Sequence, residues 1–174
     1  MNALITFYKK PGNIERMLEV IRGHSRVSLR LLDFFAANYS KAHNITLTVK
    51  AGDEEDKAST TQLVVHSSYK SQLRAYSKRN FDPFCRGNHI AFEYADNELL
   101  TTTVGQLNFF RWIISNPILE YVEGNVDPIE AEMKQTEDAQ LRKKRTEELS
   151  LSASRSICKN NDVKMLVTFD LPSC

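Results

Sequence analysis

The stretch TTTVGQLNFFRWIIS, residues 101–115, predicts a helix that is apolar on nearly every side, and the other elements must pack around it. Thr103 and Gln106 have the spacing of a capping box, in which two side chains satisfy backbone amides at the start of a helix. A helix with apolar side chains all round is stable when other elements enclose it. The apolar residues of this one are Leu107, Phe109, Phe110, Trp112, Ile113 and Ile114. We therefore expect a buried central helix that begins near Thr103.

The segments before this helix predict two β-hairpins. The sequences NITLTV at 44–49 and TQLVV at 61–65 are rich in β-branched residues, and a polar, acidic loop joins them. The sequences HIAFEY at 89–94 and LLTTTV at 99–104 flank a short turn with Asp and Asn, which suit hairpin connections. These patterns predict an α+β fold in which a small antiparallel sheet packs against the buried central helix.

The first 42 residues predict a terminal strand and an interrupted helix. A six-residue apolar run from Ala3 to Tyr8 indicates an edge or terminal strand. From Asn13 to about Ala42 apolar residues recur at helical spacing, and Asn13 is an acceptable N-cap. Gly23 falls between two apolar stripes, and glycine inside a helix costs roughly 1 kcal/mol relative to alanine. We expect either two helices or one helix that bends at Gly23.

The residues after the central helix predict a short helix and then a long charged one. Pro117 fits the first turn of the short helix, which Gly124 ends. The charged helix runs from Asp127 to about Leu149, and its few apolar residues are Ile129, Met133 and Leu141. Because so little of this helix is apolar, we expect it to project or to dock on a partner, with these three residues as the partner-binding row.

A serine-rich connector and a closing strand at 163–170 complete the predicted domain plan. Residues 1–126 and 163–170 are expected to form a single α+β core. Residues 127–162 are expected to form the charged helix and its connector. We expect this second part to supply the contact with a protein partner or with a second copy of the chain.

Composition is that of an ordinary globular protein of one domain. The chain has 174 residues, of which 41% are hydrophobic and 26% charged, and its formal net charge is +1. Any attraction to nucleic acid must therefore come from a local patch. The three cysteines are widely spaced, which suits a reducing compartment. No segment is apolar enough to span a membrane. These features predict a soluble protein of the cytoplasm or nucleus.

The stretch SSYKSQLRAYSKRNFDPFCRG, residues 67–87, is the most distinctive local pattern, because its charge is +4. A helix here places Tyr69, Leu73 and Tyr76 in one row and basic residues in a neighbouring row. The aromatic rings either anchor the helix in the core or stack on nucleobases while the cations hold phosphates. For the second alternative the predicted nucleic-acid-binding residues are Lys70, Arg74, Lys78, Arg79, Arg86, Tyr69 and Tyr76.

A second basic group lies between residues 9 and 30, where the local charge is also +4. Its bases are Lys9, Lys10, Arg16, Arg22, Arg26 and Arg30, against Glu15 and Glu19. The sequence leaves open whether this group shares a surface with the first.

The sequence contains none of the familiar catalytic patterns that join a nucleophile, a base or a phosphate loop. Cys85 and His89 form at most half of a metal site, because no second pair completes it. An enzyme with Cys85 as nucleophile and His66 or His89 as base is the remaining catalytic alternative. We expect no catalytic residues, no metal, no cofactor, no small-molecule substrate and no membrane contact.

The segments YKSQLRAYSKRNFDPFCRG and TTTVGQLNFFRW, followed by IISNPILEYV, resemble small uncharacterised proteins of nucleocytoplasmic large DNA viruses. The resemblance covers roughly residues 65–135. It implies expression in an infected cell and a role in the virus particle or its assembly. Our leading hypothesis is a non-enzymatic, virus-encoded structural or interaction protein. The alternative is a nucleic-acid-binding protein that uses residues 67–87.

Overall fold

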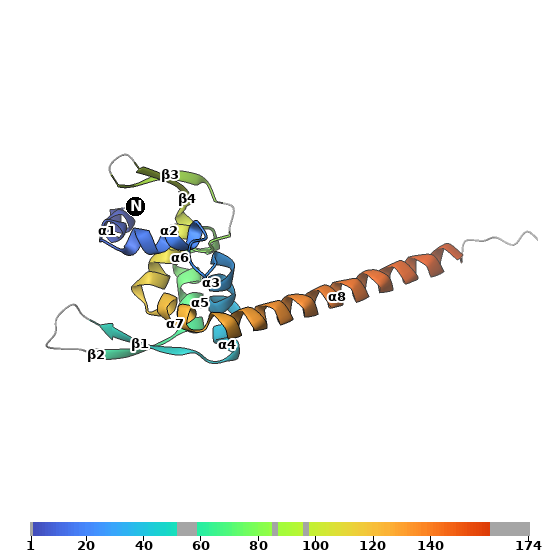
Figure 1. Cartoon of the computed structure of the whole chain (residues 1–174). Helices are drawn as coiled ribbons and strands as arrows, with labels where there is room; N and C mark the ends of the chain where they lie inside the picture. Colours follow the sequence, from blue (N-terminus) through green and yellow to red (C-terminus); the bar gives the residue numbers. More distant parts are fainter. Residues whose placement is uncertain (1, 52–58, 85–86, 96–97, 161–174) are drawn as a thin grey trace, which may run out of the picture. The chain divides into compact units, whose positions relative to one another are not determined.

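The computed structural model describes residues 2–51, 59–84, 87–95 and 98–160, and it confirms the α+β class (Figure 1). The chain divides into two compact units, Met1–Met133 and Lys134–Cys174. The strands are β1 (Thr46–Ala51), β2 (Ser59–Val64), β3 (His89–Ala95) and β4 (Glu98–Thr103). The α-helices are α1 (Asn2–Tyr8), α2 (Asn13–Ile21), α3 (Leu29–Phe34), α4 (Ser40–Ala42), α5 (Val65–Tyr76), α6 (Val104–Ser115), α7 (Ile118–Gly124) and α8 (Val126–Asn160). A π-helical turn, η1 (Phe35–Tyr39), joins α3 to α4, and a 3₁₀ turn, η2 (Lys78–Asn80), follows α5.

Helix α6 is the buried centre of the first unit, as its apolar sequence predicts. The fully enclosed side chains of α6 are Leu107, Phe109, Phe110 and Ile113. The backbone N–H of Gln106 donates to Oγ1 of Thr103 at 3.2 Å, so the predicted cap is present. The side chain of Gln106 instead accepts from Oγ1 of Thr102 at 2.8 Å.

The two predicted hairpins form, but they belong to separate sheets. Strand β1 pairs with β2 from Thr46 opposite Val64 to Ala51 opposite Ser59, and β3 pairs with β4 from His89 opposite Thr103. Strand β2 runs directly into α5 and β4 runs directly into α6. Figure 1 shows the helices of the first unit between the two hairpins. The prediction of one small sheet was wrong because helices separate the two pairs.

The first residues form helix α1, so the predicted terminal strand was wrong. Leu4 and Tyr8 lie one helical turn apart and are both buried. The hydroxyl of Tyr8 donates to the carbonyl oxygen of Leu107 at 2.7 Å, which ties α1 to the centre of α6. Burial raises the pKa of Tyr8, and the cation of Arg111 lowers it by a smaller amount. A short apolar run fits a strand and a buried helix equally well, and here the contact with α6 selects the helix.

The predicted break at Gly23 is confirmed, since α2 ends at Ile21 and Gly23 has φ 73°. The N-cap of α2 is Gly12, with φ 87°, and the predicted cap Asn13 is the first helical residue. The side-chain amide of Asn13 donates to the carbonyl oxygen of Phe7 at 2.9 Å. Asn13 therefore joins α2 to the end of α1 instead of capping α2.

The carboxyl-terminal helices differ from the prediction at their ends. Pro117 takes the N-cap position of α7, one residue before the predicted first turn. Helix α8 continues through the serine-rich segment to Asn160, where a connector was predicted. The predicted strand at 163–170 lies outside the described residues. Within those residues, no helix combines the length and apolar character needed to cross a membrane.

Candidate functional site

Two aromatic side chains of the basic stretch anchor it in the core. Tyr69 is 5% exposed, Phe81 is fully buried, and their ring centroids are 6.0 Å apart. Both rings contact Trp112 of α6, at 5.8 and 5.9 Å between centroids. The structure therefore confirms the anchoring alternative for these two rings. Tyr69 cannot stack on a nucleobase, and its predicted role in nucleic-acid binding was wrong, because its ring is enclosed by protein.

The segment after α5 is held closely against the start of α6. The side-chain amide of Asn108 donates to the carbonyl oxygen of Asn80 at 2.9 Å. A Cβ atom on Gly105 would lie 2.8 Å from the carbonyl oxygen of Asp82, which is too close for a real contact. Glycine at position 105 thus lets the backbone of 79–82 lie directly on α6. The basic residues of this segment are presented from a fixed backbone.

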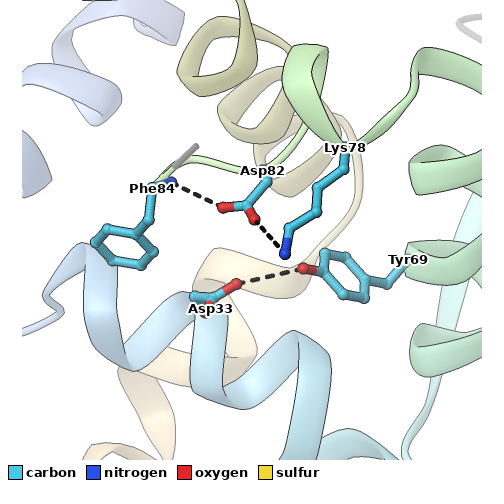
Figure 2. A network of polar contacts seen from close by, with 5 residues as sticks. All are labelled: Asp33, Tyr69, Lys78, Asp82 and Phe84. Atoms are coloured by element: carbon cyan, nitrogen blue, oxygen red, sulfur yellow. Dashed lines mark hydrogen bonds and ion pairs between the residues drawn. The ribbon is translucent and has the colours of Figure 1, made fainter. Parts of the chain in front are cut away.

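A small polar network joins α3, α5 and η2 (Figure 2). The hydroxyl of Tyr69 donates to Oδ1 of Asp33 at 3.3 Å, and Nζ of Lys78 lies 3.6 Å from Oδ2 of Asp82. Asp82 also accepts from the backbone N–H of Phe84 at 2.9 Å. Burial, and then the negative charge of Asp82, raises the pKa of Asp33. Burial is also the largest cause of the raised pKa of Tyr69. Lys78 is therefore paired with Asp82, while its side chain remains 79% exposed.

Three of the predicted cations face solvent without an acidic partner in the part of the chain that the structure describes. They are Lys70 and Arg74 of α5 and Arg79 of η2, and we name them the basic row. Arg86, the fifth predicted base, lies outside the described residues. Tyr76 is 38% exposed, and its ring stacks on Phe81 with centroids 6.0 Å apart and planes at 12°.

A polar hollow of about 200 Å³ lies between α5 and α6. It was not predicted from the sequence. We name it the α5–α6 hollow. Its lining residues are Gln72, Tyr76, Asn108, Arg111, Trp112, Ser115 and Asn116. One signal was visible in the sequence, because Arg111 is the only charged residue in the otherwise uncharged helix Val104–Ser115. A second hollow, of about 390 Å³, has Arg79 and Asn80 on one side and Ile90 and Val104 among its other lining residues.

Several bases of the second group, between residues 9 and 30, have partners from other elements. Nη1 of Arg16 lies 2.7 Å from Oε1 of Glu120, and Nη2 of Arg26 lies 3.0 Å from Oδ1 of Asp127. Nη2 of Arg22 donates to the hydroxyl of Tyr94 at 3.3 Å. Ion pairs with acidic residues thus offset the charge of Arg16 and Arg26, two of the six bases of this group.

Two residues of the predicted partner-binding row belong to the core of the first unit. Ile129 is fully buried, and Met133 is partly buried against the core. Leu141 alone of the three is well exposed, at 56%. The prediction that Ile129 binds a partner was wrong, because the core covers this residue. The predicted role of Met133, which the core covers only in part, stays a prediction.

The described residues contain no group of three or more His, Cys, Asp or Glu side chains that could hold a metal ion. Cys85 lies outside the described residues, so the structure leaves the cysteine-nucleophile alternative untested. The polar groups described above suit reversible binding through hydrogen bonds and charge.

Fold and site together define an α+β protein whose two hairpins lead into two packed helices, with a basic row on α5 and η2 and a polar hollow between α5 and α6. The chain belongs to a family of unknown function, DUF7197, which matches residues 1–170.

A viral relative supports the resemblance predicted from the sequence. The chain is 41% identical over 159 residues to the "Uncharacterized protein L507" of Acanthamoeba polyphaga mimivirus, a nucleocytoplasmic large DNA virus. The match covers 88% of this chain and 57% of the relative, so the chain spans little more than half of the relative's length. No solved structure matches the chain. The predicted similarity to proteins of this group of viruses is confirmed.

Proposed function

We propose that this chain is a non-enzymatic binding protein that holds single-stranded nucleic acid on α5 and η2. The observation that carries the proposal is the basic row of Lys70, Arg74 and Arg79, which is exposed and lacks acidic partners among the described residues. The bases at 16 and 26 are neutralised by Glu120 and Asp127. Cations left unpaired on a protein of net charge +1 are a local attraction for phosphates.

The exposed ring of Tyr76 favours a single strand over a duplex. Tyr76 is the last residue of the helix that carries Arg74, and residues two apart on a helix point to different sides of it. An aromatic surface and a cation are thus both present at this end of α5. Bases of a single strand are free to stack on such a ring, whereas bases of a duplex are already stacked on one another. Stacking and phosphate contacts together are a common way to bind single strands with little sequence preference.

Salt dependence tests this proposal. A fluorescein-labelled oligothymidylate of about 20 nucleotides is titrated with the protein between about 50 and 200 mM NaCl, with fluorescence anisotropy as readout. The affinity should fall steeply as salt rises, because phosphate contacts release counterions. The combined variant Lys70→Gln, Arg74→Gln and Arg79→Gln removes three contacts, so the log–log slope should become shallower by about two units.

The matched control removes three charges from α8, as Lys143→Gln, Lys144→Gln and Arg145→Gln. These residues are exposed, and the net charge changes equally in both variants. The control should keep the slope of the unmodified protein. Absent or salt-insensitive binding of the unmodified protein would refute the proposal, as would equal slopes for the two variants.

A second candidate function is a protein contact made by α8, as in a structural or assembly component of a virus particle. The exposed Leu141 favours it, because this residue lies on an otherwise polar part of the helix. A long polar helix gains little stability from its own sequence and is commonly stabilised by side-chain pairs or by a partner. Self-association is the form of this function that can be tested without knowing the partner.

A further inference from the structure

We propose that the α5–α6 hollow receives one unstacked nucleobase. This inference rests on the proposed function and adds a base-binding site to the phosphate-binding row. The ligand chemistry is a planar heterocycle with hydrogen-bond donors and acceptors on one edge. A base of a bound single strand and the base of a free nucleotide share this chemistry, and the experiment below separates them.

The size of the hollow suits a single base. Its volume is about 200 Å³, whereas sites for drug-sized ligands span roughly 300–1,000 Å³. That space accommodates one planar ring system, with its sugar and phosphate outside.

Tyr76 supplies a stacking surface that is already in place. One face of its ring lies against Phe81, with centroids 6.0 Å apart and planes at 12°. Phe81 is itself fully buried and contacts Phe109 and Trp112. Because packing holds Tyr76 before any ligand binds, little side-chain entropy is lost on binding. The ring is 38% exposed, so it retains area for a base.

The polar groups of the hollow offer donors and acceptors together. The side-chain amide nitrogens of Asn108 and Asn116 donate to the carbonyl oxygens of Asn80 and Trp112, at 2.9 and 2.7 Å. These bonds fix both amides and leave their Oδ1 atoms as acceptors. Arg111 adds guanidinium donors and has no ion-pair partner among the described side chains.

This mixture of groups fits a base better than a phosphate. A phosphate only accepts hydrogen bonds, so it could use Arg111 and the second N–H of each amide, but it would leave the Oδ1 atoms of Asn108 and Asn116 without a donor. A base edge carries both donors and acceptors and can pair with both kinds of group. The uncharged amides therefore select the base, and phosphates are left to the basic row.

Arg79 of the basic row lies nearest to the hollow, at the end of α5. Gln72 and Tyr76 lie one turn apart on the flank of α5 that lines the hollow. Lys70 and Arg74 lie on nearly the opposite flank, because residues two apart on a helix do not face each other. Arg79 follows the end of the helix and precedes Asn80, whose carbonyl oxygen is bound by Asn108 of the hollow. A strand that enters the hollow can thus contact Arg79, and it reaches Lys70 and Arg74 by passing over the end of α5.

Trp112 makes the inference directly testable, because it is the only tryptophan of the chain and it lines the hollow. Oligothymidylate should change its fluorescence. A strand of equal length built of abasic units keeps the phosphates, and it should bind without that change and at least about fivefold more weakly.

In the variants Tyr76→Leu and Arg111→Gln the fluorescence change on binding of oligothymidylate should be lost. Tyr76→Leu should keep the salt slope of the unmodified protein, since it removes no charge.

Phe84→Leu is the matched control, because Phe84 is 53% exposed and lies outside the hollow. Phe84→Leu should show the same fluorescence change and the same salt slope as the unmodified protein. Thymidine monophosphate is titrated separately. If it changes the fluorescence of Trp112 at concentrations similar to those of the oligonucleotide, the base site is supported and its ligand is a free nucleotide. If the abasic strand binds equally well and changes the fluorescence equally, the base site is refuted while salt-dependent strand binding stands. If no strand and no nucleotide binds, both proposals are refuted.

Discussion

Gly105 shows how a single residue fixes the geometry of the candidate site. The carbonyl oxygens of Arg79 and Asp82 would lie 3.3 and 2.8 Å from a Cβ atom at this position. Both are backbone atoms, so neither can move aside as the end of a flexible side chain can. The basic segment can lie on α6 only because position 105 has no side chain.

Gly105→Ala should therefore destabilise the protein by about 1–3 kcal/mol, the usual range for overpacking. The thermal midpoint should fall by roughly 2–10 °C for a chain of this size. Gly124→Ala is the control, because a Cβ atom at position 124 would have no neighbouring atom within 4 Å and alanine favours a helix. Thermal unfolding followed by circular dichroism compares the two, and equal midpoints would contradict the close approach.

At the scale of elements, Asp33 links α3 to α5. It accepts a hydrogen bond from Tyr69, and burial raises its pKa. A carboxyl group whose pKa is raised by folding stabilises the fold at pH values below its unfolded pKa of about 3.9, and that contribution is lost as pH rises through the raised pKa. At neutral pH the buried negative charge is thus a cost to stability.

Asp33→Asn should remove this cost, since an amide is neutral and its oxygen can still accept from Tyr69. The stability of the variant relative to the unmodified protein should be greatest at pH 7 and should decline as pH falls towards 4. Urea unfolding at pH 7 and at pH 4 measures this difference in the free energy of unfolding between the variant and the unmodified protein. Asp138→Asn, at an exposed position of α8, should show no such trend. A relative stability of Asp33→Asn that increases on acidification would contradict the role of burial.

The elements themselves were largely predictable because their signals are local. The cap at Thr103, the break at Gly23 and the two hairpins depend on neighbouring residues, and all four are present. Helix α1 was not predictable in the same way. Its helical form depends on the contact between Tyr8 and Leu107, which lies 99 residues away.

For the molecule as a whole, the first turns of α8 belong to the core, because Val126 and Ile129 are buried. Up to residue 147 of α8, every buried apolar residue among those whose side chains the structure describes lies at or before Ile129. A chain that ends at Met133 should keep the thermal midpoint of the full chain. A chain that ends at Asn125 lacks Val126 and Ile129, and it should lose at least about 2–5 kcal/mol, the usual cost of removing one large core side chain.

Sedimentation of the same two chains tests self-association through α8. If α8 carries it, the full chain sediments as an oligomer and the chain that ends at Met133 as a monomer. A monomeric full chain would contradict self-association. Equal thermal midpoints for the chains that end at Met133 and Asn125 would contradict the assignment of Ile129 to the core.

The α+β class, the buried central helix, the hairpins and the similarity to viral proteins could be predicted from the amino-acid order, because they depend on local patterns or on similarity along the chain. Which charges are paired and which apolar residues are covered became known from the folded structure. Arg16 is neutralised by Glu120, 104 residues away, and Ile129 is covered by the core. The α5–α6 hollow likewise exists only where two helices meet. Charge pairing and burial are properties of neighbours in space, and residues distant in sequence become neighbours only when the chain folds.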